Sequence, residues 1–380
     1  MLRFKNDDGS EFPEWEEHEI AELIQLYNEK VSSDCQLPIL TSSKKNGIEY
    51  QEEHFTGKQR HDIEGYNVLP RNYCTYRNRS DGTDFTFNIN KLCDKGIVSK
   101  FYPVFKEKDC DLFFLVSLLN NERKTVRKIA YTAKGTGQKV LSITDLRNIT
   151  VNMPSLPEQQ KIAEFLSTID TVIEKQKETV SAWEERKKGV MQKLFSQEVR
   201  FKADDGSEFP EWEEKNVEDV CSVSTGKGNT QDKVDTGAYR FYVRSPIIEH
   251  SDSYLFDEEA VITVGDGVGT GKVFHYVKGK YNLHQRCYRM YDFRDVTGKY
   301  FYYFFSTNFY RRVKSMSAKT SVDSVRMEMI TKMKILVPCL AEQQKIAGCL
   351  SSFDEVIEKQ KATLAAWEEL KKGLLQQMFV

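Results

Sequence analysis

The chain contains 380 residues, of which 39% are hydrophobic and 29% charged, and its formal net charge is −2. This length exceeds one ordinary core and predicts two domains of roughly 150–200 residues, while the composition excludes a disordered chain. No stretch approaches the ~20 apolar residues of a membrane helix, and the polar N-terminus is unlike a signal peptide. Eight cysteines without a C-x-x-C pair predict free thiols in a reducing cytoplasm rather than a zinc site or a disulfide framework.

The first element along the chain is an acidic arm that occurs twice. Residues 3–17 read RFKNDDGSEFPEWEE and residues 200–214 read RFKADDGSEFPEWEE, so that 14 of 15 positions are identical. The segments between the arms and the later repeat, roughly 18–155 and 215–339, do not realign. A scaffold that is repeated once around two unlike inserts suits a protein that presents two recognition surfaces in one fixed geometry.

The first insert reads as a mixed α/β domain with a helix near 110–121. Its turn-rich segments 38–50, 75–87 and 133–139 combine basic, hydroxyl, amide and aromatic side chains, which are the types that contact DNA phosphates and base edges. For any one of these residues, an exposed polar loop without a ligand remains the alternative. The predicted DNA-binding residues of this insert are Thr41, Ser42, Ser43, Lys44, Lys45, Tyr76, Arg77, Arg79, Lys134, Thr136, Gln138 and Lys139.

A long helix is predicted over 156–195, and residues 340–379 repeat it with 26 of 40 positions identical. Apolar residues alternate at spacings of three and four, which is typical of coiled-coil helices. Pro154 and Pro157 mark the start of the first helix, because proline is tolerated only in the first turn. We expect the two copies to pair with each other; packing of each helix on its own domain, or homodimerisation through the same seam, are the alternatives. The predicted seam contains Ile162, Leu166, Ile169, Ile173, Val180, Trp183, Ile346, Leu350, Phe353, Ile357, Leu364 and Trp367.

The second insert also reads as mixed α/β, with a helix near 298–315 and strands at Tyr239–Val243, Ala260–Val264 and Lys272–Val277. Residues 263–274 fail as a phosphate-binding Walker A loop, because Asp266 stands at the first glycine position and Val273 comes after Lys272. We interpret them as a tight turn between two strands. The predicted DNA-binding residues of this insert are Arg244, Lys272, His284, Gln285, Arg286, Lys319, Thr320 and Ser321.

Charge is distributed unevenly among these parts. Residues 1–17 and 199–214 each carry −4, whereas the inserts 18–155 and 215–338 carry +3 and +5. The variable parts are therefore the basic parts, which favours a polyanionic partner. The six histidines lack H-E-x-x-H spacing, and G-x-S-x-G and Pro-Pro motifs are absent from the sequence. The chain therefore reads as a recognition protein without a catalytic or metal site of its own.

The repeated frame resembles the specificity subunit of type I DNA restriction–modification systems. Each insert is closed by a strand, Ile149–Met153 or Met333–Val337, and then by Leu-x-Glu-Gln-Gln-Lys-Ile-Ala at 156–163 or 340–347. The resemblance covers essentially the whole chain. The departures are mild, with Ala341 in place of Pro157 and Gly348-Cys349 in place of Glu164-Phe165.

The resemblance implies two target recognition domains, 1–155 and 199–339, and two conserved spacer helices, 156–198 and 340–380. It implies a mixed α/β fold in which long antiparallel coiled-coil helices separate the domains with pseudo-two-fold symmetry. In that family each domain recognises one half of a split DNA site, and the helices dock two methyltransferase subunits. Those subunits use S-adenosylmethionine to methylate adenine, and restriction subunits that use ATP and Mg²⁺ translocate and cut DNA. The chain itself is then a non-catalytic, cytoplasmic protein of a bacterium or archaeon, without a cofactor.

Two other classes of protein are the alternatives. A structural adaptor for two protein partners predicts hydrophobic or acidic inserts, so the basic inserts disfavour it. A stand-alone enzyme requires an active site, and the sequence supplies none.

Overall fold

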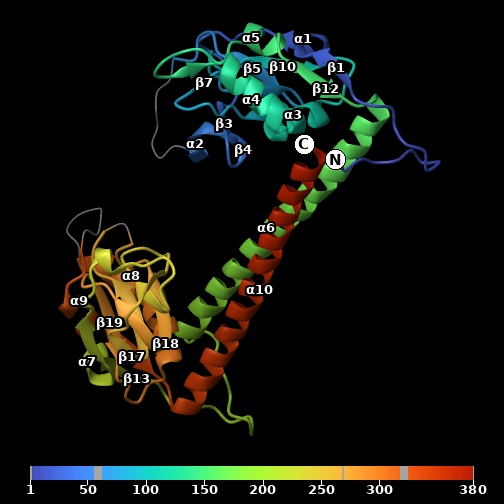
Figure 1. Cartoon of the computed structure of the whole chain (residues 1–380). Helices are drawn as coiled ribbons and strands as arrows, with labels where there is room; N and C mark the ends of the chain where they lie inside the picture. The colour runs from blue at the N-terminus through green and yellow to red at the C-terminus, as the bar shows by residue number, and fades with distance from the viewer. Residues whose placement is uncertain (1, 55–61, 268, 317–323, 380) are drawn as a thin grey trace. The chain divides into compact units, whose positions relative to one another are not determined.

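The computed structural model describes residues 2–54, 62–267, 269–316 and 324–379. The chain divides into two compact units, of which unit 1 comprises Met1–Lys177 with Thr363–Val380, and unit 2 comprises Glu178–Ala362. Each unit therefore contains one α/β domain together with part of each long helix (Figure 1).

The domain of unit 1 is built from short strands and helices. Its elements are β1 (Glu16–Glu19), α1 (Ile20–Leu23), β2 (Ile24–Tyr27), β3 (Leu40–Ser43), β4 (Gly47–Tyr50), α2 (Gln51–His54), β5 (Asn67–Pro70), β6 (Cys74–Tyr76), β7 (Arg79–Ser80), β8 (Phe87–Ile89), β9 (Lys95–Val98), β10 (Val104–Glu107), α3 (Leu112–Asn121), α4 (Arg123–Thr132), β11 (Lys139–Val140), α5 (Ile143–Arg147) and β12 (Thr150–Met153). A four-stranded antiparallel sheet runs in the order β2-β10-β6-β8. The helix predicted near 110–121 is α3, which confirms that prediction.

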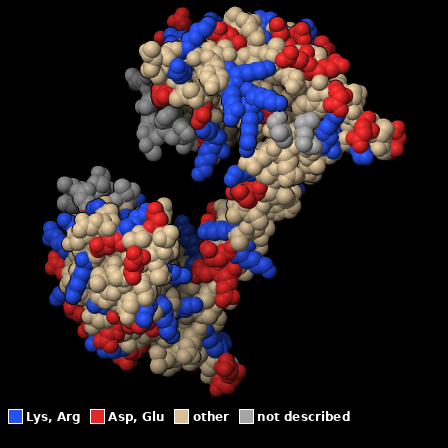
Figure 2. All heavy atoms as spheres, in the orientation of Figure 1, with Lys and Arg blue, Asp and Glu red and all other residues tan. Residues whose placement is uncertain are grey.

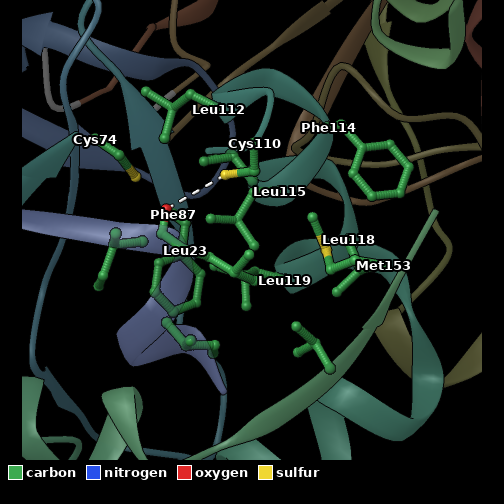
Figure 3. Packing of buried hydrophobic residues seen from close by; sticks show 14 of the residues in the cluster. Leu23, Cys74, Phe87, Cys110, Leu112, Phe114, Leu115, Leu118, Leu119 and Met153 are labelled. Carbon is green, nitrogen blue, oxygen red and sulfur yellow. Dashed lines mark hydrogen bonds between the residues drawn. The ribbon is translucent and has the colours of Figure 1, made fainter. Parts of the chain in front are cut away.

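The core of this domain lies between that sheet and α3. Phe87 and Phe114 are fully buried in it, and the Cys110 thiol donates a hydrogen bond to the Leu23 carbonyl oxygen at 3.3 Å (Figure 3). The α3 segment reads LFFLVSLLNN, and its apolar residues lie on most sides of the helix, so that it packs in the middle of the core. Asp111 caps its N-terminus by accepting the Phe114 N–H at 2.8 Å.

The domain of unit 2 has a larger sheet and one long helix. Its elements are β13 (Glu213–Asn216), α7 (Val217–Val220), β14 (Ser222–Thr225), the 3₁₀ helix η1 (Thr230–Asp232), β15 (Tyr239–Tyr242), β16 (Glu249–Ser251), β17 (Phe256–Val264), β18 (Phe274–Leu283), β19 (Cys287–Tyr291), α8 (Gly298–Met316), α9 (Met327–Thr331) and β20 (Lys334–Val337). The six-stranded sheet runs in the order β14-β19-β17-β18-β15-β16, with β15 and β18 parallel and the other pairs antiparallel. Fully buried aromatic residues of α8, among them Phe301, Phe305 and Phe309, cover it.

The predicted strands and helix of this insert are confirmed as β15, β17, β18 and α8. The prediction of a tight turn over 263–274 is wrong in one respect. Strands β17 and β18 do pair, with Thr263 opposite Phe274, but residues 265–273 connect them as a longer loop. The first glycine of this loop, Gly265, packs against the backbone of Arg286 and does not form a two-residue turn.

The long helices α6 (Leu156–Phe195) and α10 (Leu340–Met378) run antiparallel within each unit. In unit 1, Asp170 pairs with Lys371 and Lys177 pairs with Glu368; the residue number rises along α6 while it falls along α10. In unit 2, Glu184 pairs with Lys361 and Lys187 pairs with Asp354 in the same sense. The predicted pairing of the two helix copies is therefore confirmed.

The alternative that each helix packs on its own domain holds for the first turns. Ile162 and Leu166 belong to the core of the first domain, and Ile346 and Leu350 belong to the core of the second. The far ends are also buried: Met378 and Phe379 join the core of unit 1, and Leu194 and Phe195 join that of unit 2. Of the remaining seam residues, Ile169, Ile173, Val180 and Ile357 are buried, and Trp183, Phe353, Leu364 and Trp367 are partly exposed.

The repeated arms are the second part of the frame. The end of each arm forms a strand that pairs with the strand before the long helix, β1 with β12 and β13 with β20. Arg3 donates two hydrogen bonds to the buried carboxylate of Glu158, at 3.1 and 2.9 Å, and Arg200 donates two to Glu342 at the same distances. Leaving a buried carboxylate unpaired is strongly destabilising, so this bidentate ion pair ties each arm to its helix, together with a second pair, Lys161–Asp7 or Lys345–Asp204.

The glutamine after each of these glutamates joins the helix to its domain. Gln159 accepts the Asp111 N–H at 2.9 Å and donates to the Pro154 carbonyl at 2.8 Å. Gln343 accepts the Thr297 N–H and donates to the Pro338 carbonyl in the same manner. The Glu and the first Gln of the Glu-Gln-Gln motif thus have a structural explanation: the Glu binds the arm and the Gln binds the domain. The predicted fold class, mixed α/β domains joined to a pair of long antiparallel helices, is confirmed.

Candidate nucleic-acid interface

Most predicted residues of the first domain gather around residues 79–84. The short strand β11 pairs with β7, which sets Lys139 opposite Ser80, and Gln138 donates a hydrogen bond to Asp81 at 3.1 Å. The β3–β4 hairpin reaches the same segment, because Lys44 pairs with Asp84 at 2.7 Å. Polar side chains from three separate stretches of sequence therefore lie together on one side of the domain.

Within this group the side chains differ in their availability to a ligand. Arg77, Lys45 and Thr136 are exposed, and Gln138 is exposed although it donates to Asp81. The others have contacts within the domain: the Arg79 guanidinium stacks on Phe101, Lys134 pairs with Asp145, the Ser42 hydroxyl accepts from Asn88, and Thr41 and Ser43 are partly buried in β3. The exposed residues are therefore the stronger candidates for contacts to DNA.

The prediction that Tyr76 contacts DNA is wrong. Its side chain is fully buried, and its hydroxyl donates to the Leu141 carbonyl at 3.0 Å. Burial raises its pKa far above the ordinary range. The ring packs at 4.8 Å from that of Phe87, so Tyr76 is a core residue and cannot stack on a base. The three residues of β6 are all buried, and the alternation that would have separated core from surface is absent there.

A cationic helix face was missed by the sequence analysis. Helix α4 exposes Arg123, Lys124, Arg127 and Lys128, while Thr125 and Ile129 of the same helix are buried. Among the described residues, Arg123, Lys124 and Arg127 have no ion-pair partner. Tyr131 is 88% exposed at the end of the same face. Figure 2 shows Lys and Arg side chains gathered over the α3–α4 helices of this unit. The sequence RKTVRKIAYT could have indicated this face, because its basic residues recur at helical spacing.

In the second domain, predicted residues surround one carboxylate. The side chains of Arg244 and Arg286 each pair with Asp266, at 3.3 and 3.2 Å, and Gln285 lies beside Arg286 in the turn between β18 and β19. His284, in the same turn, is only 5% exposed. Burial and the nearby Arg244 charge lower the pKa of His284, so its ring is neutral at pH 7. The buried ring of His284 supports the turn and is not available to read bases.

The other predicted residues of this domain are Lys272 and residues 319–321. The Lys272 ammonium lies over the ring of Tyr310, 5.2 Å from its centroid, and its side chain is exposed. Lys319, Thr320 and Ser321 lie outside the described residues. Among the described residues, Arg244 and Arg286 around Asp266 are therefore the predicted DNA-binding residues of this domain that lie together.

Among the described residues, no group of three or more His, Cys, Asp or Glu side chains could hold a metal ion. The buried thiols are poor nucleophiles, because burial raises the pKa of Cys110 to about 11 and that of Cys221 to about 12. No helix in the described part of the chain is long and apolar enough to cross a membrane.

Comparison with known proteins agrees with this arrangement. Residues 14–181 and 210–366 match the model of the "Type I restriction modification DNA specificity domain". The chain is 24% identical over 318 residues to the type I restriction enzyme MjaVIII specificity subunit of Methanocaldococcus jannaschii, which covers 75% of this chain and 73% of that protein. It is 24% identical over 166 residues to the type I restriction enzyme EcoDI specificity subunit of Escherichia coli, covering 44% of this chain and 36% of that protein.

Solved structures share the fold. The S subunit of the type I restriction–modification system from M. genitalium aligns with a TM-score of 0.63 and 14% identity, covering 100% of this chain and 98% of that one. A chain from a structure of type I restriction–modification complex assembly aligns with a TM-score of 0.50 over 97% of this chain and 98% of its own length, also at 14% identity. Both matches of the family model fall on the repeated frame and its inserts, and together they span most of the sequence. The chain therefore belongs to the family of type I restriction–modification specificity subunits.

Proposed function

We propose that this chain recognises a bipartite, asymmetric DNA site, reads one half with each domain, and positions methyltransferase and restriction subunits on it. The observation that carries this proposal is the repetition of one frame around two unlike domains. Equivalent contacts, Arg3 with Glu158 and Arg200 with Glu342, hold each arm to its helix. Different domains in equivalent frames are suited to two different sequences, so the two half-sites should differ.

DNA is favoured over a protein partner because each domain exposes cations that suit a polyanion. In the first domain, Arg123, Lys124 and Arg127 on α4 are unpaired within the described structure, so they are free to neutralise phosphates. In the second domain, Lys272 is exposed and Arg286 is 64% exposed. Two major-groove readers on one face of B-DNA require half-site centres about one helical turn, ~10 bp, apart.

The same repetition supports two copies of one partner. The exposed part of each arm is acidic and folds in the same way: Lys5 pairs with Glu11, and Lys202 pairs with Glu208, both at 2.8 Å. Two matching surfaces on one chain suit two methyltransferase subunits, one for each half-site. Each partner would bind S-adenosylmethionine and flip the target adenine out of the duplex. ATP and Mg²⁺ belong to the restriction subunits, and this chain contributes the positioning.

The composition of the purified complex tests this assignment. The chain is co-expressed with the methyltransferase of its own system, and the mass of the complex is measured by native mass spectrometry with and without DNA. We expect one copy of this chain with two methyltransferase copies, and a gel shift of DNA that carries the methylated motif. A complex with one methyltransferase that fully methylates both strands would refute the two-partner model.

A further inference from the structure

The turn between β18 and β19 is held rigidly from several sides. The His284 N–H donates to the Tyr242 carbonyl at 2.9 Å, and the Gln285 N–H donates to the Gly228 carbonyl at 2.8 Å. The Arg286 N–H donates to the His284 Nδ1 atom at 3.0 Å. The backbone of the turn is thus fixed by the end of β15, by the loop at Gly228 and by a buried imidazole, which is the kind of support that a recognition site requires.

The loop that begins at Gly265 is locked onto the same turn. The Gly265 N–H donates to the Arg286 carbonyl at 2.8 Å, and a Cβ atom on Gly265 would lie 2.6 Å from that oxygen. Only glycine permits this close approach, and it brings Asp266 beside the Arg286 side chain. The Asp266 Oδ2 atom then receives Arg286 Nη1 at 3.2 Å, while its Oδ1 atom receives Arg244 Nη1 at 3.3 Å. One carboxylate therefore orients two guanidinium groups.

The three charged side chains differ in exposure. Asp266 is 22% exposed, Arg244 is 49% exposed and Arg286 is 64% exposed. Each guanidinium has five N–H donors, and the pairing with Asp266 accounts for one Nη atom of each. The other donors remain on exposed groups whose orientation is fixed by the carboxylate. Gln285, which is exposed beside them, uses its amide N–H on the Asn229 side chain at 2.7 Å.

The carboxylate of Asp266 favours binding of a base edge over binding of a phosphate. A phosphate site gains from net positive charge, and the carboxylate both repels a phosphate and reduces the net charge of the two arginines from +2 to +1. A base edge is neutral, and its recognition depends on donors held in a fixed direction. The guanine O6 and N7 atoms accept a bidentate pair from one arginine, and a carboxylate accepts from the cytosine N4 amino group. Arginine and aspartate side by side therefore match a G·C pair.

We infer that Arg286, together with Arg244, reads a guanine in the half-site of the second domain, and that Asp266 is the positioning residue that orients both guanidinium groups. This inference rests on the proposed DNA-recognition function and names the base that one element of it reads. It predicts at least one G·C pair in the half-site of this domain that is recognised in the major groove.

Modified bases test the inference with the unaltered protein. The methylation motif is first read from genomic DNA of cells that carry the complete system. Each guanine of both half-sites is then replaced, one at a time, by 7-deazaguanine, which lacks the N7 acceptor, or by inosine, which keeps O6 and N7 but lacks the minor-groove amino group. In competition binding to the purified complex, we expect one guanine at which 7-deazaguanine weakens binding about tenfold or more while inosine does not.

Variants assign that guanine to the cluster. The complex that contains Arg286→Ala should bind two duplexes with equal affinity: the one with guanine at this position and the one with 7-deazaguanine there. Asp266→Asn keeps the size of the side chain but removes its negative charge, and it should reduce discrimination at the same base pair by a smaller factor. Arg294→Ala is the matched control, because Arg294 is an exposed arginine beyond the opposite end of β19, and it should leave the discrimination unchanged.

Three results would overturn the inference. One is that 7-deazaguanine weakens binding at no guanine of either half-site. Another is an Arg286→Ala complex that binds every duplex more weakly by the same factor, which indicates a phosphate contact. The third is full discrimination by Asp266→Asn. In each of these cases a bipartite motif would still support the proposed function, whereas a complex that binds no bipartite duplex would refute the proposed function itself.

Discussion

Lys187 and Asp354 form an ion pair between α6 and α10 in unit 2, with 2.5 Å between Nζ and Oδ1. The equivalent residues of the repeat, Lys371 and Asp170, form the same pair at 2.5 Å in unit 1, with donor and acceptor exchanged between the helices. Two more exposed pairs, which lie between these along α6, repeat as well, since Lys361–Glu184 corresponds to Lys177–Glu368. The duplicated sequence is thus used twice in the seam, each time against the other copy.

Charge reversal should test the Asp170–Lys371 pair. Asp170→Lys places two ammonium groups together at a half-buried position, and we expect it to lower the free energy of unfolding by about 1–2 kcal/mol. The double swap Asp170→Lys with Lys371→Asp should recover most of this loss. Glu368→Lys alters the more exposed Lys177–Glu368 pair and is expected to cost less than about 0.5 kcal/mol. Chemical denaturation of the four proteins gives the comparison, and an unrescued double swap would show that the pair does not stabilise the seam.

The buried ends of the helices give a second prediction. Phe379 is 1% exposed and its ring lies 5.7 Å from that of Phe114 in the core of unit 1. Phe379→Ala should destabilise this unit by about 3–5 kcal/mol, because it removes a large buried side chain and leaves a cavity. Hydrogen exchange should quicken in the sheet β2-β10-β6-β8 and stay unchanged in the six-stranded sheet. Leu370→Ala, at a residue that is 48% exposed on the same helix, is the control.

A fragment of residues 1–198 should form a homodimer. Its single long helix carries both Asp170 and Lys187, so two antiparallel copies can form the seam ion pair twice. Leu194 and Phe195 of the second copy stand at the positions equivalent to Met378 and Phe379, which fill the core of unit 1 in the full chain. Light scattering should give twice the fragment mass, and Lys187→Asp should weaken the dimer. A stable, folded monomer would contradict this prediction.

Acidification should destabilise unit 2 through His284. Burial lowers the pKa of this side chain below its usual value of 6.5, and its Nδ1 atom accepts the Arg286 N–H. Because the unfolded chain binds the proton more readily, the stabilising contribution is complete above pH 6.5 and is lost as the pH falls below it. The slope is at most about 1.4 kcal/mol per pH unit for one such group. Thermal melts from about pH 7.5 to 5 should show a smaller loss for His284→Asn than for the unaltered chain; identical losses would exclude His284 as the cause.

The cationic face of α4 should contribute to affinity without contributing to sequence choice. Removing Arg127 and Lys124 together should weaken binding to all duplexes by the same factor and lower the slope of log K against log salt by about 2. Measurements at several salt concentrations with specific and unrelated duplexes test this. Lys91→Ala is a control, because that ammonium is engaged over the Phe113 ring. A loss confined to one sequence would instead assign base readout to α4.

The sequence predicted the parts of this molecule that are encoded locally. The arms, the heptads and the strands before each helix were visible because they recur with the same residues. Asp266 could not be identified in this way, since its role depends on Arg244 and Arg286, which reach it from other parts of the folded sheet. Tyr76 was misread for a related reason: it lies in a short strand that is buried on both faces, among residues whose polar character suggested a surface.

Methylation mapping across the genome is the most direct test of recognition of two unlike half-sites. Cells that carry the complete system should methylate one bipartite motif with two unlike halves, centred about one helical turn apart. Arg77→Ala in the first domain should alter recognition of one half only, and Arg286→Ala in the second domain should alter the other half only. A single contiguous or palindromic motif, or a change in the same half from both substitutions, would contradict the assignment of one half-site to each domain.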